Sequence, residues 1–222
     1  MPRLEIVIAT RNPKKARELA RLMRGLPVRW RSLQEFPDAP TIREDGRTFR
    51  ENAIKKALLS AHTTKRLALA DDSGLLVKAL GNRPGVRSAR FAGRHGADEA
   101  NNLKVLRLLR QVRGLRRAAA FSCVLALADP RRRILAITEG HLPGLIALQP
   151  QGRGGFGYDP IFWIPRLGKT AAQLSLSKKN QLSHRAQAAR RMRTRLVRLL
   201  PSLTRRVDSS RLAGPGSRVA QG

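Results

Sequence analysis

The chain has 222 residues, with 45 Lys and Arg against 15 Asp and Glu and a formal net charge of +30. This length is typical of one domain with a sizeable core, and no apolar run approaches the ~18 residues of a membrane span. A single cysteine, Cys123, excludes an intramolecular disulfide and predicts a reducing, cytoplasmic location. The charge predicts attraction to polyanions, such as nucleoside polyphosphates, nucleic acid or an acidic surface. Composition bias is the favoured explanation for most of the arginine excess.

Hydrophobic periodicity predicts an α/β protein with a more β-rich second half. The expected elements, in chain order, are a strand over residues 4–10, helices over 14–24 and 48–63, a short buried strand over 67–70, a helix over 98–112, paired strands over 119–128 and 133–148, a glycine-rich loop over 152–160, an apolar segment over 161–164 and a basic helix over 183–200. Pro201 is expected to stop the last helix. The sequence therefore predicts one domain over residues 1–203 and a basic, disordered tail over 204–222.

Two adjacent carboxylates, Asp71 and Asp72, directly follow the buried run 67–70 and precede Ser73 and Gly74. Strand ends beside glycine are where α/β folds place metal ligands and catalytic bases. Adjacent carboxylates repel each other, so a cation or a strong donor between them is expected, and a divalent metal carrying phosphates is one such cation. An Asx-type turn that ends the strand explains these residues equally well.

The segment 10–15 joins the first expected strand to the first helix. A helix N-terminus offers free N–H donors to an anion, Thr10 and Asn12 add polar groups, and Lys15 adds a cation one turn later. An ordinary capped helix start is the alternative. Farther along, Asn52 and Lys56 share one face of the second helix, and Glu44 before it is either a turn residue or a metal ligand.

The glycine-rich loop 152–160 allows close approach of its backbone to a ligand, and Phe156 and Tyr158 offer ring faces to a base. It matches neither the phosphate loop nor the dinucleotide fingerprint, and a plain hairpin loop is the alternative. Ser183 is expected to cap the last helix, where His184 and Arg185 can donate to a carbonyl oxygen or phosphate. Cys123 is expected to be a packed core thiol, and three histidines without metal-ligand spacing are expected to be structural or at the surface: His62, His95 and His141.

Together and in order, these segments resemble the Ham1-like family of inosine/xanthosine triphosphate pyrophosphatases. The matching segments are Thr10-x-Asn12-x-x-Lys15, Glu44-Asp45-Gly46-x-Thr48-Phe49-x-Glu51-Asn52-Ala53-x-x-Lys56-Ala57, Ala70-Asp71-Asp72-Ser73-Gly74-Leu75, Pro84-Gly85-Val86-x-Ser88-Ala89-Arg90-Phe91, 154–162, Lys169-Thr170-Ala171-Ala172 and Ser183-His184-Arg185. The resemblance covers about residues 4–200. The chain departs from the family pattern at Ser177-Lys178 and at Arg43, where acidic residues are usual.

The resemblance implies a long mixed β-sheet flanked by helices, with two lobes and a central cleft. It also implies a homodimer that uses Mg²⁺ to hydrolyse ITP, dITP or XTP between the α and β phosphates, releasing the monophosphate and pyrophosphate. Asp72 would be the catalytic base and, with Glu44, a metal ligand, while Asp71 would support them. The substrate-binding residues implied are Thr10, Arg11, Asn12, Pro13, Lys14, Lys15 and Lys56 around the triphosphate, Ser73, and Phe156, Gly157, Tyr158, Asp159, Lys179, His184 and Arg185 around the purine.

Two other functions compete with this interpretation. The Maf-like nucleotide pyrophosphatases have a similar fold and a basic strand-to-helix opening, but they lack the Asp-Asp-Ser-Gly and Ser-His-Arg segments. A nucleic-acid-binding module would explain the charge of +30, but the chain has few aromatic residues and no recognisable recognition motif. Non-specific contact with nucleic acid is therefore expected only as a secondary property.

Overall fold

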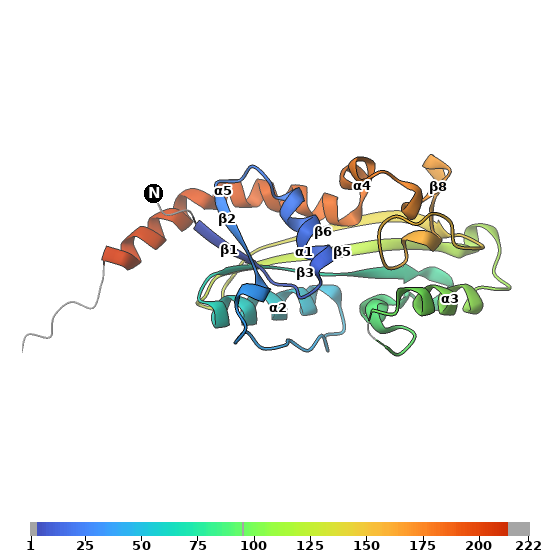
Figure 1. Ribbon diagram of the computed structural model, residues 1–222, viewed down its shortest axis with the longest axis horizontal. Helices are drawn as coiled ribbons and strands as arrows, with labels where there is room; N and C mark the ends of the chain where they lie inside the picture. Colours follow the sequence, from blue (N-terminus) through green and yellow to red (C-terminus); the bar gives the residue numbers. More distant parts are fainter. Residues whose placement is uncertain (1–3, 95, 213–222) are drawn as a thin grey trace, which may run out of the picture.

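The computed structural model describes residues 4–94 and 96–212 of the chain (Figure 1). Its strands are β1 (Leu4–Ile8), β2 (Val28–Ser32), β3 (Leu67–Val77), β4 (Arg83–Pro84), β5 (Ala118–Ala128), β6 (Ile134–Ile146), β7 (Phe162–Ile164) and β8 (Lys169–Thr170). Its α-helices are α1 (Pro13–Leu22), α2 (Phe49–Thr64), α3 (Asp98–Leu108), α4 (Leu176–Leu182) and α5 (His184–Leu212). None of these helices is long and apolar enough to cross a membrane.

All eight strands join one mixed sheet in the order β2-β1-β3-β5-β6-β7-β8, with β4 beside β3. The pairs β1–β2 and β1–β3 are parallel, and the other pairs are antiparallel. The prediction of a mixed sheet flanked by helices is therefore confirmed.

The helices cover the sheet on both faces because side chains alternate along each strand. Leu67 and Leu69 of β3 pack in a core cluster with α1 and α5, whereas Ala68 and Ala70 pack in another with α2. Figure 1 shows α5 along one side of the sheet and α2 along the other. The α2 layer is lined by alanines such as Ala53, which allows the helix to lie close to the strands.

Strands β3, β5 and β6 are long enough to run through two apolar clusters. One end of β3, at Leu67 and Leu69, belongs to the cluster under α1 and α5. The other end, at Leu75 and Val77, belongs to a separate cluster that includes α3 and β7 residues. The strand therefore links two cores, and the stretch between Leu69 and Leu75 lies where they meet.

Two predicted boundaries differ from the structure by the largest margin. The strand expected to end at residue 70 continues to Val77, because residues 68–77 pair in unbroken register with β5. The last helix continues through Pro201 to Leu212, so the part of the expected tail over 204–212 is helical, and residues 213–222 lie outside the described chain. Leu196 and Leu203 are buried on either side of Pro201, and this packing offsets the loss of one helical hydrogen bond.

Candidate active site

Asp71 and Asp72 lie in the middle of β3, at a gap along one of its edges. Strand β1 pairs with β3 only as far as Leu69, and β4 pairs only from Leu76 onward. On the other edge β5 pairs continuously. Among the described strands, none covers the β1-side edge between these points, so the two carboxylates lie beyond the carboxyl end of β1, where helix side chains reach them.

The two carboxylates belong to opposite faces of the sheet, as strand alternation requires. Asp71 is fully buried on the face covered by α1 and α5. Its Oδ2 lies 3.3 Å from Lys15 Nζ and 3.4 Å from Arg185 Nη2. Burial alone would raise the pKa of Asp71, but the charges of Lys15 and Arg185 outweigh it and hold the pKa well below its usual range.

Arg185 links Asp71 to two further polar groups. Its guanidinium donates to Ser73 Oγ at 2.8 Å and to Glu18 Oε2 at 2.7 Å. Burial would lower the pKa of Arg185, but Glu18 and Asp71 raise it and keep the guanidinium charged. Glu18, one turn after Lys15 on α1, was not singled out from the sequence, although its i,i+3 spacing from Lys15 places both on one helix face.

On the α2 face, the negative charge of Asp72 is balanced less completely by nearby positive charges than that of Asp71. Asn52 Nδ2 donates to its Oδ2 at 2.9 Å, and the Ser73 backbone N–H donates to its Oδ1 at 3.0 Å. Burial raises the pKa of Asp72 to about 6, although Lys56 and Lys15 act in the opposite direction. Lys56 also donates to Glu44 Oε1 at 2.8 Å, so two carboxylates and one lysine meet here.

The start of α1 is a capped helix, as the simpler interpretation predicted. Asn12 Oδ1 accepts from the backbone N–H groups of Lys14 and Lys15 at 3.0 and 3.2 Å, and Thr10 Oγ1 accepts from Asn12 N–H at 3.2 Å. The expectation that these helix N–H groups are free for an anion was therefore wrong. The Lys15 ammonium provides the positive charge at this end of the helix instead.

The three other residues of this segment bond elsewhere or are exposed. Arg11 donates through Nη2 to the Ala39 carbonyl at 2.5 Å. Pro13 and Lys14 begin α1 and are exposed. The described contacts therefore bring Lys15, but not Arg11, to the carboxylates of β3.

The glycine-rich loop places an aromatic ring near two cations. Lys179 Nζ lies 5.3 Å and the Arg185 guanidinium carbon 5.7 Å from the centroid of the Phe156 ring. Asp159 forms an ion pair with Lys179 and accepts from the Phe156 backbone N–H at 2.8 Å. Gly155 has φ +80°, and a Cβ there would meet Asp159 Oδ2 at 2.1 Å, so only glycine fits.

Tyr158 does not offer its ring to a ligand, and that part of the prediction was wrong. The side chain is 5% exposed and packs in the core, and its hydroxyl donates to the Ser88 carbonyl at 2.8 Å. Helix α3 holds the neighbouring Gly157: Asp98 accepts from its N–H at 2.8 Å, and Asn102 donates to its carbonyl at 3.1 Å. Nothing in the spacing of these α3 residues points to this loop.

His184 lies at the first turn of α5, beside the same loop. Its ring stacks on Phe121 with centroids 4.8 Å apart, and its Nδ1 is buried without a hydrogen-bond partner. Burial, with the nearby charge of Arg185, lowers the pKa of His184 well below its ordinary value, so the ring is neutral. Ser183 caps the helix by accepting from Ala186 N–H at 3.1 Å, as predicted.

The remaining candidates from the sequence are Cys123 and three histidines. Cys123 is fully buried, and burial raises its pKa to about 12, which confirms a core thiol. The His62 ring lies against the Pro130 carbonyl, His141 lies beside Glu139, and His95 lies outside the described residues. Within residues 4–94 and 96–212, no three His, Cys, Asp or Glu side chains form a ready-made metal site.

Comparison with known proteins identifies the family. The sequence model of the Ham1 family matches residues 6–195. The chain is 50% identical over 183 residues to the dITP/XTP pyrophosphatase of Geobacter sulfurreducens, covering 82% of this chain and 92% of that protein, and 52% identical over 184 residues to the enzyme of the same name from Geobacillus kaustophilus, covering 83% and 90%. A solved HAM1 protein from Coxiella burnetii superposes with a TM-score of 0.81 at 43% identity, covering 88% of this chain and 99% of that one. The chain therefore belongs to the Ham1 family.

Proposed function

We propose that this protein is a pyrophosphatase of non-standard purine nucleoside triphosphates, converting ITP, dITP or XTP to the monophosphate and pyrophosphate. The observation that carries the proposal is the buried set on and around β3, in which Asp71, Asp72 and Glu44 meet Lys15 and Lys56. Relatives about half identical to this chain are named dITP/XTP pyrophosphatases. Hydrolysis removes deaminated purines before a polymerase can use them.

Lys15 and Lys56 are suited to hold the triphosphate. Phosphoryl chemistry depends mainly on positioning and on neutralising charge, and both ammonium groups pair with carboxylates of this set, Lys15 with Asp71 and Lys56 with Glu44. The Thr10 hydroxyl and the Asn12 amide lie at the same helix start and would add polar contacts to the phosphates, beside Arg11, Pro13 and Lys14. Ser73, held by Arg185, would contact the substrate from β3.

Asp72 would act as the base on the attacking water. A general base works best when its pKa lies near the working pH, and burial brings the pKa of this carboxyl to about 6. The hydrogen bonds from Asn52 and from the Ser73 backbone fix the carboxylate plane. Asp71 is unsuited to this role, because Lys15 and Arg185 stabilise its ionised form and weaken it as a base.

The residues present suit a Mg²⁺ ion. Mg²⁺ is bound through one or two carboxylates together with substrate phosphates, not by a protein cage of many ligands. Glu44 and Asp72 provide two carboxylates, and the charge of Glu44 contributes to the raised pKa of Asp72, an effect that a bound cation would relieve. These two residues would hold the ion, which when bound would neutralise charge on the phosphates.

Phe156 would stack on the purine, with Gly157 and Tyr158 shaping the loop behind it. Asp159, Lys179, His184 and Arg185 would recognise the edge of the base. Donors that face the 6-position favour a carbonyl, because an amino group at that position would leave them unpaired. The buried, unpartnered Nδ1 of neutral His184 supports a role for this ring in such recognition.

Further properties follow as proposals from the family resemblance and the composition. We propose a cytoplasmic homodimer, with residues 1–203 as the catalytic domain and 204–222 as a basic extension. Non-specific contact with nucleic acid is a secondary property proposed from the net charge of +30.

The test is a panel of nucleoside triphosphates with Mg²⁺ and detection of pyrophosphate. ITP and XTP should be hydrolysed far faster than ATP and GTP. Equal turnover of ATP would contradict the proposed base recognition, and release of orthophosphate alone would contradict the proposed cleavage site.

A further inference from the structure

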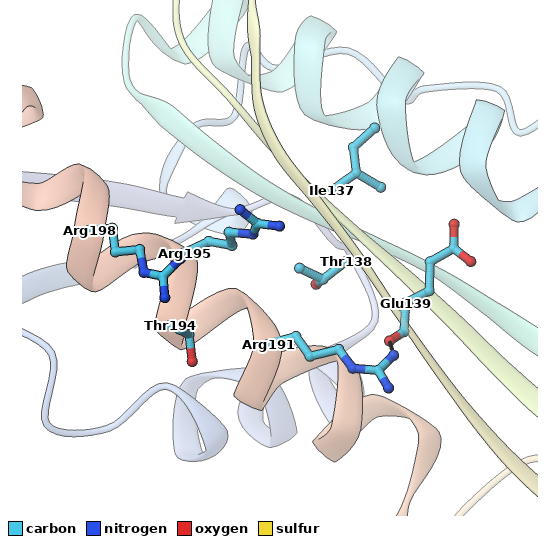
Figure 2. A pocket seen from close by; sticks show the side chains of 7 residues that line it. All are labelled: Ile137, Thr138, Glu139, Arg191, Thr194, Arg195 and Arg198. Atoms are coloured by element: carbon cyan, nitrogen blue, oxygen red, sulfur yellow. Dashed lines mark hydrogen bonds between the residues drawn. The ribbon is translucent and has the colours of Figure 1, made fainter.

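A second basic site lies outside the active site, in a cavity of about 400 Å³ between α5 and β6. The β6 side is lined by Ile137, Thr138 and Glu139, and the α5 side by Arg191, Thr194, Arg195 and Arg198 (Figure 2). We call this cavity, with its seven lining residues, the α5–β6 groove.

The groove starts where α5 and β6 are in direct contact. Thr138 Oγ1 donates to the Ala188 carbonyl at 2.9 Å, and a Cβ at Gly140 would meet the His184 carbonyl oxygen at 2.1 Å. About one turn after Ala188, Arg191 donates to the Glu139 carbonyl, a contact visible in Figure 2. These contacts hold the helix and the strand as fixed walls of the groove.

Three arginines project into the groove from one face of the helix. Positions 191, 195 and 198 follow i, i+4 and i+7 spacing, which places their side chains in one row. At ~1.5 Å rise per residue the row spans about 10.5 Å. Like charges at this spacing destabilise a helix unless an anion compensates them.

Compensation from within the protein is small. Among the described residues, Arg195 and Arg198 have no acidic partner, and both are exposed. Glu139 is the single acid of the lining, and its carboxylate is already engaged by Arg50 Nε at 3.3 Å and His141 Nε2 at 3.8 Å. The groove therefore keeps a net positive charge that an external anion can neutralise.

We infer that the α5–β6 groove binds the phosphate backbone of a nucleic acid strand. Each neutralised phosphate requires a cation, and the three arginines, spaced about 6 and 4.5 Å along the helix, provide one for each of about three phosphates. No aromatic or amide side chain lines the groove, so no ring is present for stacking bases, and the arginine row is placed to meet phosphates, whose contacts carry no sequence information. Binding is therefore independent of sequence and dependent on salt. The inference assigns a site to the nucleic-acid contact proposed above from the net charge, and it does not depend on the proposed hydrolysis.

The test is fluorescence anisotropy of a labelled single-stranded oligothymidylate with the full chain at about 50 to 200 mM salt. For single strands the slope of log K against log salt is about −0.7 per neutralised phosphate, so the double variant Arg195→Gln/Arg198→Gln should reduce the slope by about 1.4. The matched control is Arg107→Gln/Arg110→Gln, which removes two exposed arginines near the end of α3, at the other end of the molecule (Figure 1). This control should leave the slope nearly unchanged.

Equal losses in the two double variants would overturn the inference, because diffuse charge alone would then explain binding. Displacement of the oligomer by micromolar pyrophosphate at constant ionic strength would also overturn it, in favour of a small anion as the occupant. Pyrophosphate release from ITP should be the same in both variants as in the unmodified protein, because Arg195 and Arg198 lie about 15 to 20 Å along α5 from Arg185. Loss of oligonucleotide binding and loss of ITP hydrolysis are thus separate outcomes.

Discussion

Replacing Asp72 by Asn tests whether this carboxylate is the base while leaving the shape of the site intact. Loss of a general base costs ~10²–10⁴-fold in rate. The expected result is such a loss in turnover of ITP at saturating Mg²⁺, measured by pyrophosphate release, with a folded protein. The corresponding change at the neighbouring position, Asp71→Asn, is the matched control for stability.

The stability of the Asp72→Asn variant should depend on pH in a defined direction. In the folded protein the pKa rises from 3.8 to about 6, which corresponds to about 3 kcal/mol against folding once the carboxyl is ionised. Because the folded-state pKa lies above the unfolded one, this cost is absent below about pH 4, grows as the pH rises toward about 6 and is complete above that pH. Relative to the unmodified protein in EDTA, the variant should therefore gain about 1–2 kcal/mol between about pH 5 and pH 8.

Two hydrogen-bond donors limit the stability that the Asp72→Asn variant gains. Asn52 Nδ2 and the Ser73 N–H each point at one oxygen of Asp72. The Asn52 amide is also fixed from its other side, where its Oδ1 accepts from Gly46 N–H at 2.8 Å. An amide at position 72 can accept only one of these bonds, which costs about 1–3 kcal/mol. The melting temperature should thus stay within a few degrees of the unmodified protein near neutral pH.

Asp71→Asn should instead destabilise the protein. It leaves Lys15 and Arg185 without their buried counterion, and breaking a buried ion pair costs about 3–5 kcal/mol, or roughly 6–20 °C in melting temperature for a chain of this size. Near-normal turnover in Asp72→Asn would remove this residue from the mechanism. A loss of activity that followed unfolding, as in Asp71→Asn, would make Asp72 a structural residue instead.

Three further predictions concern other parts of the chain. Gly155→Ala should lower kcat/KM for ITP at least tenfold without unfolding the protein, because its Cβ would displace Asp159; unchanged kinetics would show that the loop adapts. Arg117→Met should lower the free energy of unfolding by about 3–5 kcal/mol, because the buried guanidinium donates to four carbonyls, those of Leu109, Val112, Ile146 and Ala147. A small shift in melting temperature would mean that water replaces the guanidinium. Truncation after Leu203 should leave ITP turnover within a few-fold, since it retains the last described core residue; a collapse in activity would show that the helical extension docks onto the domain.

Local patterns in the sequence predicted most elements but not their limits. The second helix was expected over 48–63 and occupies Phe49–Thr64, because Thr48 caps it by accepting from Glu51 N–H and the alanine pattern continues to its end. Strand β3 was expected to stop at residue 70, since Asp and Gly are disfavoured in strands. The long apolar partner β5, which pairs with residues 68–77, overrides that preference.

Partners that are distant in the sequence were the least predictable part of the site. Phe156 and Tyr158 are both aromatic and two residues apart, yet one lies beside Lys179 and Arg185 and the other is buried in the core. Which ring is buried is decided by β7 and α3, which the local sequence does not specify. Glu18 was missed for the same reason, because its partner Arg185 is 167 positions away.

The alternation along β3 explains why the site is at this position. On one face the strand presents Leu69, Asp71, Ser73 and Leu75, so two polar side chains replace core residues between two apolar clusters. Burying them is unfavourable unless each is paired, and the helices on that face supply Lys15 and Arg185 for this purpose. On the other face Asp72 is paired less completely, and burial leaves it with a pKa near neutrality. The same strand thus holds one carboxylate that stabilises the junction of the two cores and, one residue later, one that remains available for proton transfer.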